Sequence, residues 1–209
     1  MSKRDSLLRA GERMFSSYGY RDVNVSDITE ETGLGTGTFY IYFKSKEDFY
    51  GQIIERIEQR GIRSIDKLIN SFHSPLNKLK ALYRFATLAL KQNSILQGLI
   101  TRNKKYIYPG LNDNYPRTNP LTKHIRGLIL SVIREGNEKR LFRSGIYKNP
   151  ENMLFAIYSA VVSEYSSTNI EELMDDILLL IERGMKRRLR LRNRDERLDK
   201  KNRRAKMKK

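Results

Sequence analysis

Apolar residues recur at helical spacing along almost the whole chain, and no stretch alternates apolar and polar residues as a half-buried strand does. Prolines are scarce, at 5 in 209 residues, and β-branched residues do not cluster in runs. The pattern predicts an all-α chain. Gly19 is expected to end the first helix, whose inner stripe consists of Leu7, Gly11, Met14, Phe15 and Tyr18.

Two short helices joined by a tight turn are expected next. Asn24 offers an N-cap with Asp27 three residues later, a variant of the capping box, and Ile28 lies on the inner face of this second helix. Gly33 stops the helix, and a third helix is expected to run from about residue 36 to residue 43. Two short helices around a glycine-containing turn form the helix-turn-helix pattern.

A larger helical unit is expected behind this pattern. Its helices are predicted at residues 45–69, 75–92, 94–105, 121–139, 150–166 and 170–188. The segment 71–75 breaks the first of them and is the expected hinge between a small front unit and a larger rear unit. Residues 108–120 contain three prolines and a glycine, and turn-rich segments of this length are often functional or mobile.

The composition argues against several classes of protein. The chain has no cysteine, which rules out disulfides, thiolate metal sites and a cysteine nucleophile. No apolar run approaches the ~18 residues of a membrane span, so we expect a cytoplasmic protein with no membrane partner. Two histidines without a nucleophile motif or a phosphate-binding loop assemble no catalytic centre, and we expect no enzyme activity.

An acidic cluster near the C-terminus raises the question of a metal site. It consists of Glu171, Glu172, Asp175 and Asp176. Acidic residues in the first turns of a helix complement the helix dipole without any ion. We therefore expect no metal and no cofactor.

The formal net charge of +17 is unevenly distributed. Residues 183–209 contain fifteen basic and three acidic residues, whereas residues 1–50 contain seven basic and eight acidic residues. The basic tail is expected to fray into disorder, to act as a solubility tail, or to contact DNA nonspecifically and steepen the salt dependence of binding, which is the alternative we favour. Any DNA contact in the first 50 residues must come from the placement of individual side chains.

The stretch LGTGTFYIYF, residues 34–43, has the composition of a helix that enters a groove. On a helix of 3.6 residues per turn, Phe39 and Phe43 point with Leu34 into the core of the front unit. Gly35 and Gly37 then remove side chains where the first turn meets DNA, and the exposed backbone N–H groups favour a phosphate. Hydroxyl groups for bases and phosphates come from Thr36, Thr38, Tyr40 and Tyr42.

Two neighbouring residues extend this surface. Lys46, at the start of the next helix, is placed for a phosphate, and Ile41 is placed for a thymine methyl group. Plain core packing is the alternative, because helical pairs with aromatic residues more often serve a core. Exposed glycines and paired tyrosines favour the DNA contact.

The run VNVSDITEETGLGTGTFYIYFKSKEDF at residues 23–49, preceded by AGERMFSSYGY at 10–20, closely resembles the DNA-binding domain of TetR-family transcriptional regulators. The resemblance implies an all-α homodimer with a three-helix helix-turn-helix domain at residues 1–47, a helical ligand-binding and dimerisation domain at 48–190, and a basic tail at 191–209. It also implies that the following residues face DNA: Asn24, Ser26, Thr36, Gly37, Thr38, Tyr40, Tyr42 and Lys46.

Three positions depart from the family pattern. Gly35 stands where the family usually has a Ser or Thr cap, which costs only a few tenths of a kcal/mol. Thr36 stands where a basic residue is frequent, so the grip on a phosphate is weaker. Thr29 replaces a small alanine that usually lets two helices approach.

The resemblance also implies a cavity for a small-molecule effector in the rear unit. Its expected lining comprises Tyr83, Arg102, Tyr106, His124, Phe155 and Tyr158. Core packing explains the rings equally well, and a solvated helix face explains Arg102, although Arg102, Lys104, Lys105 and Arg126 together suit an acidic ligand. The two last helices are expected to pair across the two-fold axis through Met153, Ile157, Val161, Met174, Ile177 and Ile181.

These expectations describe a ligand-responsive transcriptional regulator, and a repressor in particular. It would bind a palindromic double-stranded operator as a homodimer and be released by an effector of unspecified identity. The alternative is a nonspecific nucleic-acid-binding protein that acts through the basic tail.

Overall fold

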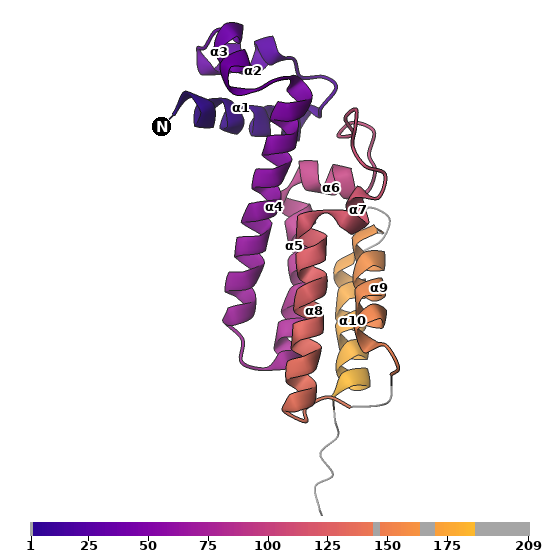
Figure 1. The fold of residues 1–209 in the computed structure, drawn as a ribbon. Coiled ribbons are helices and arrows are strands. Elements are labelled where there is room, and N and C mark those ends of the chain that lie inside the picture. The colour runs from indigo at the N-terminus through magenta and orange to yellow at the C-terminus, as the bar shows by residue number, and fades with distance from the viewer. Residues whose placement is uncertain (1, 144–146, 164–169, 187–209) are drawn as a thin grey trace, which may run out of the picture.

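The computed structural model describes residues 2–143, 147–163 and 170–186, and the regular elements in these ranges are all helices (Figure 1). The all-α prediction is therefore confirmed. None of the helices described is long and apolar enough to cross a lipid bilayer. In chain order the helices are α1 Lys3–Tyr18, α2 Val25–Thr32, α3 Thr36–Tyr42, α4 Lys46–Asn70, α5 Pro75–Gln92, α6 Ser94–Ile100, α7 Tyr115–Thr118, α8 Pro120–Glu138, α9 Pro150–Ser163 and α10 Ile170–Met185.

The inner face of α1 differs from its prediction at one residue. Leu7, Gly11 and Phe15 are buried as predicted, but the Tyr18 side chain is 58% exposed. Gly19 has a φ of 81° and turns the chain, so that Tyr20 covers the end of the core instead. The Tyr20 ring lies 6.1 Å from the Phe15 ring, centre to centre.

The helix-turn-helix forms as predicted. Asn24 and Asp27 make a capping box at the start of α2, with the Asn24 backbone N–H donating to the Asp27 carboxylate at 2.7 Å. Gly33 ends α2 in the left-handed conformation at φ 66°, which glycine adopts without strain. From α3, Phe39 and Phe43 are buried, and both rings pack against the Phe49 ring of α4.

The long helix α4 connects the front unit to the rear bundle (Figure 1). Ser45 caps it by accepting a hydrogen bond from the Asp48 N–H at 3.2 Å. Buried isoleucines at 53, 54 and 57 then run down its inner face. Because α4 is one continuous helix, any tilt of its rear half is transmitted to the front unit.

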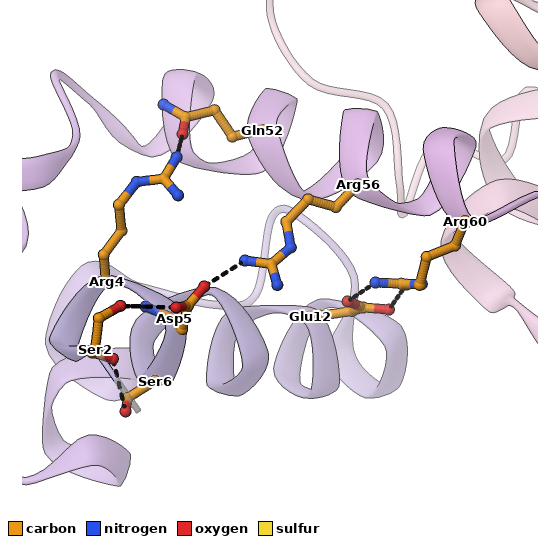
Figure 2. A network of polar contacts seen from close by, with 8 residues as sticks. All are labelled: Ser2, Arg4, Asp5, Ser6, Glu12, Gln52, Arg56 and Arg60. Carbon is orange, nitrogen blue, oxygen red and sulfur yellow. Dashed lines mark hydrogen bonds and ion pairs between the residues drawn. The ribbon is translucent and has the colours of Figure 1, made fainter. Parts of the chain in front are cut away.

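Polar contacts fasten α1 along α4 (Figure 2). Arg4 donates to the Gln52 side chain at 2.5 Å, Arg56 donates to Asp5 at 3.1 Å, and Arg60 pairs with both carboxylate oxygens of Glu12. The Ser2 hydroxyl and then Arg56 hold the pKa of the Asp5 carboxyl below its usual value. Exposed ion pairs stabilise a fold weakly, so we assign these contacts mainly to the orientation of α1 on α4.

In the rear unit, α5 and α8 pack together and are flanked by α4, α9 and α10 (Figure 1). One helix end and one additional helix differ from the prediction. Helix α6 ends at Ile100 rather than at 105, because Arg102 has a φ of 59° and the chain folds back until the Tyr106 ring packs on Gly98. The turn-rich segment 108–120 contains the short helix α7, which the sequence did not reveal.

Candidate nucleic-acid interface and effector cavity

The outer face of α3 carries large side chains that the protein does not cover. Tyr40 is 58% exposed, Ile41 is 77% exposed and Tyr42 is 39% exposed. Thr36, at the first position of the helix, is also exposed, whereas Phe39 between them is fully buried. Helix α3 therefore separates one anchoring face from one face that is free to meet a partner.

The glycines at the start of α3 have no role in packing. A Cβ atom built on Gly35 or on Gly37 meets nothing within 4 Å. Neither residue has a positive φ, so any amino acid could adopt its backbone conformation. Packing within the chain therefore requires glycine at neither position, although Gly35 also serves as the N-cap of α3.

The predicted residues of α2 lie beside this face. Asn24 and Ser26 are exposed. The Ser26 hydroxyl donates to Asp27 at 3.4 Å, a long contact that leaves it free to turn toward a partner. The two residues are thus accessible, although Asn24 also serves the cap of α2.

Thr38 and Lys46 are less accessible than the sequence suggested. Both are half-buried. The Lys46 ammonium lies 4.4 Å from the centre of the Tyr20 ring, and burial lowers the pKa of this lysine. The structure also places Lys44 in the turn between α3 and α4, exposed and without a side-chain partner in the described ranges. The sequence signal for Lys44 was its position directly after the FYIYF run.

The predicted effector residues do not gather at one place. Tyr83, Phe155 and Tyr158 lie together in the bundle, where the Tyr83 hydroxyl donates to the Leu154 carbonyl at 2.5 Å and the Tyr158 ring is 6.1 Å from each of the other two rings. The other three have separate partners. Arg102 pairs with Asp113 at 2.6 Å, His124 with Asp66 at 2.6 Å, and Tyr106 with a backbone carbonyl of α1.

A cavity of about 470 Å³ opens beside this aromatic cluster. Its size is that of pockets for small organic ligands. Of the predicted residues, Phe155 and Tyr158 line it. The complete lining that the structure describes is Ile100, Pro116, Arg117, Thr122, Phe155, Ala156, Tyr158, Ser159, Ala160 and Val162.

A second hollow of about 320 Å³ lies against α4. None of the six predicted effector residues lines it, and its wall includes Ile57 and Gly61 of α4 and Phe85 of α5. A void of about 10 Å³ in the bundle shares Leu121 with this hollow and Tyr158 with the larger cavity. This void therefore touches lining residues of both.

Tyrosine hydrogen bonds join the rear unit to the connecting helix α4 and to α1 of the front unit. The Tyr115 hydroxyl of α7 donates to Glu58 of α4 at 2.5 Å, and Glu58 is only 3% exposed. Burial raises the pKa of the Glu58 carboxyl, and this effect outweighs the hydrogen bond from Tyr115, which lowers the pKa. The Tyr106 hydroxyl donates to the Ser16 carbonyl of α1 at 3.1 Å. Sequence reasoning missed this junction, because its residues lie about 60 positions or more from their partners.

The residues predicted for dimerisation are largely covered within one chain. Val161, Met174 and Ile181 are at most 4% exposed. Met153, Ile157 and Ile177 are partly buried against the same core. The exposed apolar side chains of α10 are Leu173, Leu179 and Leu180, at 39%, 43% and 66% exposure. The dimer interface itself stays a prediction.

Comparison with known proteins identifies the front unit. Residues 7–53 match the family described as bacterial regulatory proteins, tetR family. The HTH-type transcriptional repressor KstR2 of Mycolicibacterium smegmatis is 30% identical over 82 residues, 39% of this chain and 40% of that protein. The transcriptional regulator AcuR of Cereibacter sphaeroides is 28% identical over 111 residues, 53% of this chain and 51% of that protein. The match thus spans about half or less of these relatives.

The fold of the whole chain has a counterpart among solved structures. The transcriptional regulator FadR from Bacillus subtilis, in complex with stearoyl-CoA, superposes with a TM-score of 0.66 at 19% identity, covering 87% of this chain and 99% of that one. This likeness extends the shared architecture from the front unit to the rear bundle. The helix-turn-helix and the match over residues 7–53 together identify the front unit as a DNA-binding domain of the tetR family of bacterial regulatory proteins.

Proposed function

We propose that this protein represses transcription by binding a palindromic DNA operator as a homodimer, and that a small molecule in the rear unit releases it. The observation that carries the proposal is the outer face of α3. Its exposed tyrosines follow, and its exposed Thr36 lies between, two glycines that packing within the chain does not require. A helix with such a face suits the major groove, where base edges and phosphates accept hydrogen bonds.

On DNA, Thr36, Tyr40 and Tyr42 contact bases and phosphates, and Gly37 allows the backbone to approach. Asn24 and Ser26 at the start of α2 contact the phosphate backbone. Lys46 reaches a phosphate after leaving the Tyr20 ring, and Lys44 supplies a second cation. The short reach of hydroxyl groups requires the helix to sit deep in the groove.

Two such helices need a fixed separation. Half-sites of a palindrome are spaced by about one DNA turn of ~34 Å or a multiple, so the dimer must hold two α3 helices at that spacing. We assign the pairing surface to α9 and α10, with Leu173, Ile177 and Leu180 as its apolar stripe. These residues follow the i, i+4, i+7 spacing of one helix face, and two of them are exposed.

The effector site is the 470 Å³ cavity, and α7 connects it to the DNA-binding unit. Pro116 and Arg117 line the cavity, and Tyr115 in the same short helix bonds to Glu58 of α4. A ligand that displaces α7 therefore disturbs the buried bond that holds α4. The FadR structure with stearoyl-CoA supports a ligand-binding role for a bundle of this architecture. A coupling of about 1–3 kcal/mol between ligand and operator is typical for such proteins.

Selection of bound duplexes from a random DNA pool tests the function. A specific regulator enriches one palindromic sequence, and unlabelled random DNA competes poorly for it. Enrichment of no sequence, with binding lost after removal of residues 191–209, would instead support the alternative of nonspecific binding by the basic tail. The concentration of positive charge in that tail is the observation that favours the alternative.

A further inference from the structure

The walls of the larger cavity are mostly apolar. Ile100, Pro116, Phe155 and Val162 contribute hydrocarbon surface, and the α9 residues Ala156 and Ala160 add small side chains that widen it. Such walls favour the apolar body of an organic ligand over a small polar metabolite, because burial of apolar surface drives binding. The chemical identity of the ligand then depends on the few polar groups.

Arg117 is the charged residue of this lining. Its side chain is exposed, and no hydrogen-bond or ion-pair partner for it exists among the residues that the structure describes. The neighbouring Arg126 is already engaged, since it donates to Asn152 at 3.1 Å and lies 5.1 Å from the centre of the Phe155 ring. Arg117 therefore offers the available guanidinium at this cavity, and guanidinium groups bind carboxylates with paired hydrogen bonds.

Tyr158 supplies a second donor in the cavity wall. The residue is 6% exposed and lines the cavity, and its hydroxyl has no hydrogen-bond partner in the described part of the chain. In the described ranges, every fully buried side-chain nitrogen or oxygen atom has a hydrogen-bond partner. Because the Tyr158 hydroxyl has none, its oxygen atom must be accessible to solvent. Burial raises the pKa of the Tyr158 hydroxyl, which keeps it protonated and able to donate. Thr122 is not equivalent, because its hydroxyl already donates to the Pro116 carbonyl at 3.2 Å.

We propose that the effector is an amphipathic organic anion, with an apolar body against the Phe155 side of the cavity and its acidic group within reach of Arg117 and the Tyr158 hydroxyl. This inference rests on the proposed function for its regulatory meaning, and it adds the ligand class. Two unpartnered donors and no acidic side chain in the described lining leave the ligand to supply the acceptors. A neutral apolar ligand would offer no acceptor to either donor, and covering the largely buried Tyr158 hydroxyl without a partner costs binding free energy.

Two probes of matched length test the ligand class on the full-length protein: octanoate and octan-1-ol, measured by isothermal titration calorimetry at neutral pH. We expect octanoate to bind about 10-fold more tightly than octan-1-ol. In Arg117→Gln this preference should fall to about twofold or less, and in Tyr158→Phe octanoate should bind several-fold more weakly. Lys123→Gln is the matched control, because Lys123 is an exposed cation next to Thr122 that does not line the cavity. It should keep the full preference.

Equal affinity of the two probes for the unaltered protein would overturn the proposal, and so would an undiminished preference in Arg117→Gln. Ala160→Phe narrows the cavity and should weaken both probes together, which localises the site independently of charge. Operator binding is measured separately on the selected duplex. If the duplex is bound but octanoate binds no better than octan-1-ol, the proposed ligand class is wrong and the proposed regulatory function is still supported. If octanoate binds as expected and no duplex is selected, the ligand class stands and the regulatory function is wrong.

Discussion

The front and rear units of this chain place their candidate functional residues in opposite ways. In the front unit these residues lie between positions 24 and 46, and most of them are exposed on or beside the two short helices α2 and α3. In the rear unit the cavity lining extends from Ile100 to Val162 and comes from four helices, α6, α7, α8 and α9. One surface is a local feature of the chain, and the other exists only after the bundle has packed.

This difference bears on how each unit responds to change. A side chain on the outer face of α3 can be removed without opening the core, because Phe39 and Phe43 carry the packing. A side chain in the cavity wall belongs to the bundle as well as to the site. Front-unit variants should therefore separate binding from stability more cleanly than rear-unit variants.

The largest effect is expected at the proposed pairing surface on α9 and α10. In Leu173→Asp combined with Leu180→Asp, two charges would have to be buried in the pairing surface, so the dimer should weaken by at least ~100-fold. Sedimentation velocity measures the dissociation. Leu141→Asp is the control, since Leu141 is 46% exposed and lies outside α9 and α10. A dimer that survives the double change would place the pairing surface elsewhere.

The next effect concerns the front unit alone. Tyr40→Ala should weaken binding to the selected duplex by about 10-fold to 100-fold, which corresponds to the ~1–3 kcal/mol of one base contact. Its thermal unfolding should stay unchanged because the side chain is exposed. Tyr18→Ala is a close control, since both tyrosines are 58% exposed. Fluorescence anisotropy with labelled duplex measures the affinities, and equal losses in the two variants would remove α3 from the interface.

The same contrast explains what could be predicted from the sequence. Helical spacing, caps and glycine stops are local signals, and they located α1 to α4 closely. Tyr18 was predicted to be buried, but the chain turns at Gly19, which has a positive φ, so that Tyr20 is buried instead. The exposed face of α3 followed from the same periodicity that buries Phe39.

The rear unit was predictable only as a set of helices. Arg117 and Glu58 gave no local signal, because the role of each depends on residues that approach it through folding. Glu58 had the pattern of an ordinary helix residue, and only the approach of Tyr115 from 57 positions away shows that its carboxyl is buried in a hydrogen bond. The rings of Tyr83, Phe155 and Tyr158 were found because aromatic residues concentrate in cores, whether or not a cavity forms beside them.

The buried Glu58 carboxyl, which joins α4 to α7, should give the stability a dependence on pH. Burial raises its pKa above the usual 4.5, so folding favours the protonated carboxyl. The protonated carboxyl contributes its whole stabilisation at pH values below the pKa of Glu58 in the unfolded chain. This stabilisation is lost as the pH rises through the pKa of Glu58 in the folded protein. Glu58→Gln retains an acceptor for Tyr115 and carries no charge. Relative to the unaltered protein, its free energy of unfolding should therefore improve as pH rises from about 4 to about 8.

Urea unfolding at several pH values measures this difference. The control is Glu30→Gln, because Glu30 is exposed on α2 and has no side-chain partner in the described ranges. This control reports the effect of removing one exposed carboxylate from the surface. If Glu58→Gln showed no larger dependence on pH than this control, the pKa of the Glu58 carboxyl would be the same in the folded and the unfolded protein, which would contradict the effect of burial.

The smallest effect is the one that best separates folding from recognition. Gly37→Ala should raise the free energy of unfolding by about 0.5–1 kcal/mol, because alanine favours a helix and its Cβ meets nothing within 4 Å. The same methyl group should weaken duplex binding if the backbone of α3 approaches DNA closely. Gly51→Ala is the control, since Gly51 lies in α4 with equally open space at its Cβ. The close approach is supported if Gly37→Ala stabilises the fold and weakens duplex binding while Gly51→Ala changes binding little. Unchanged duplex affinity in both variants would contradict it.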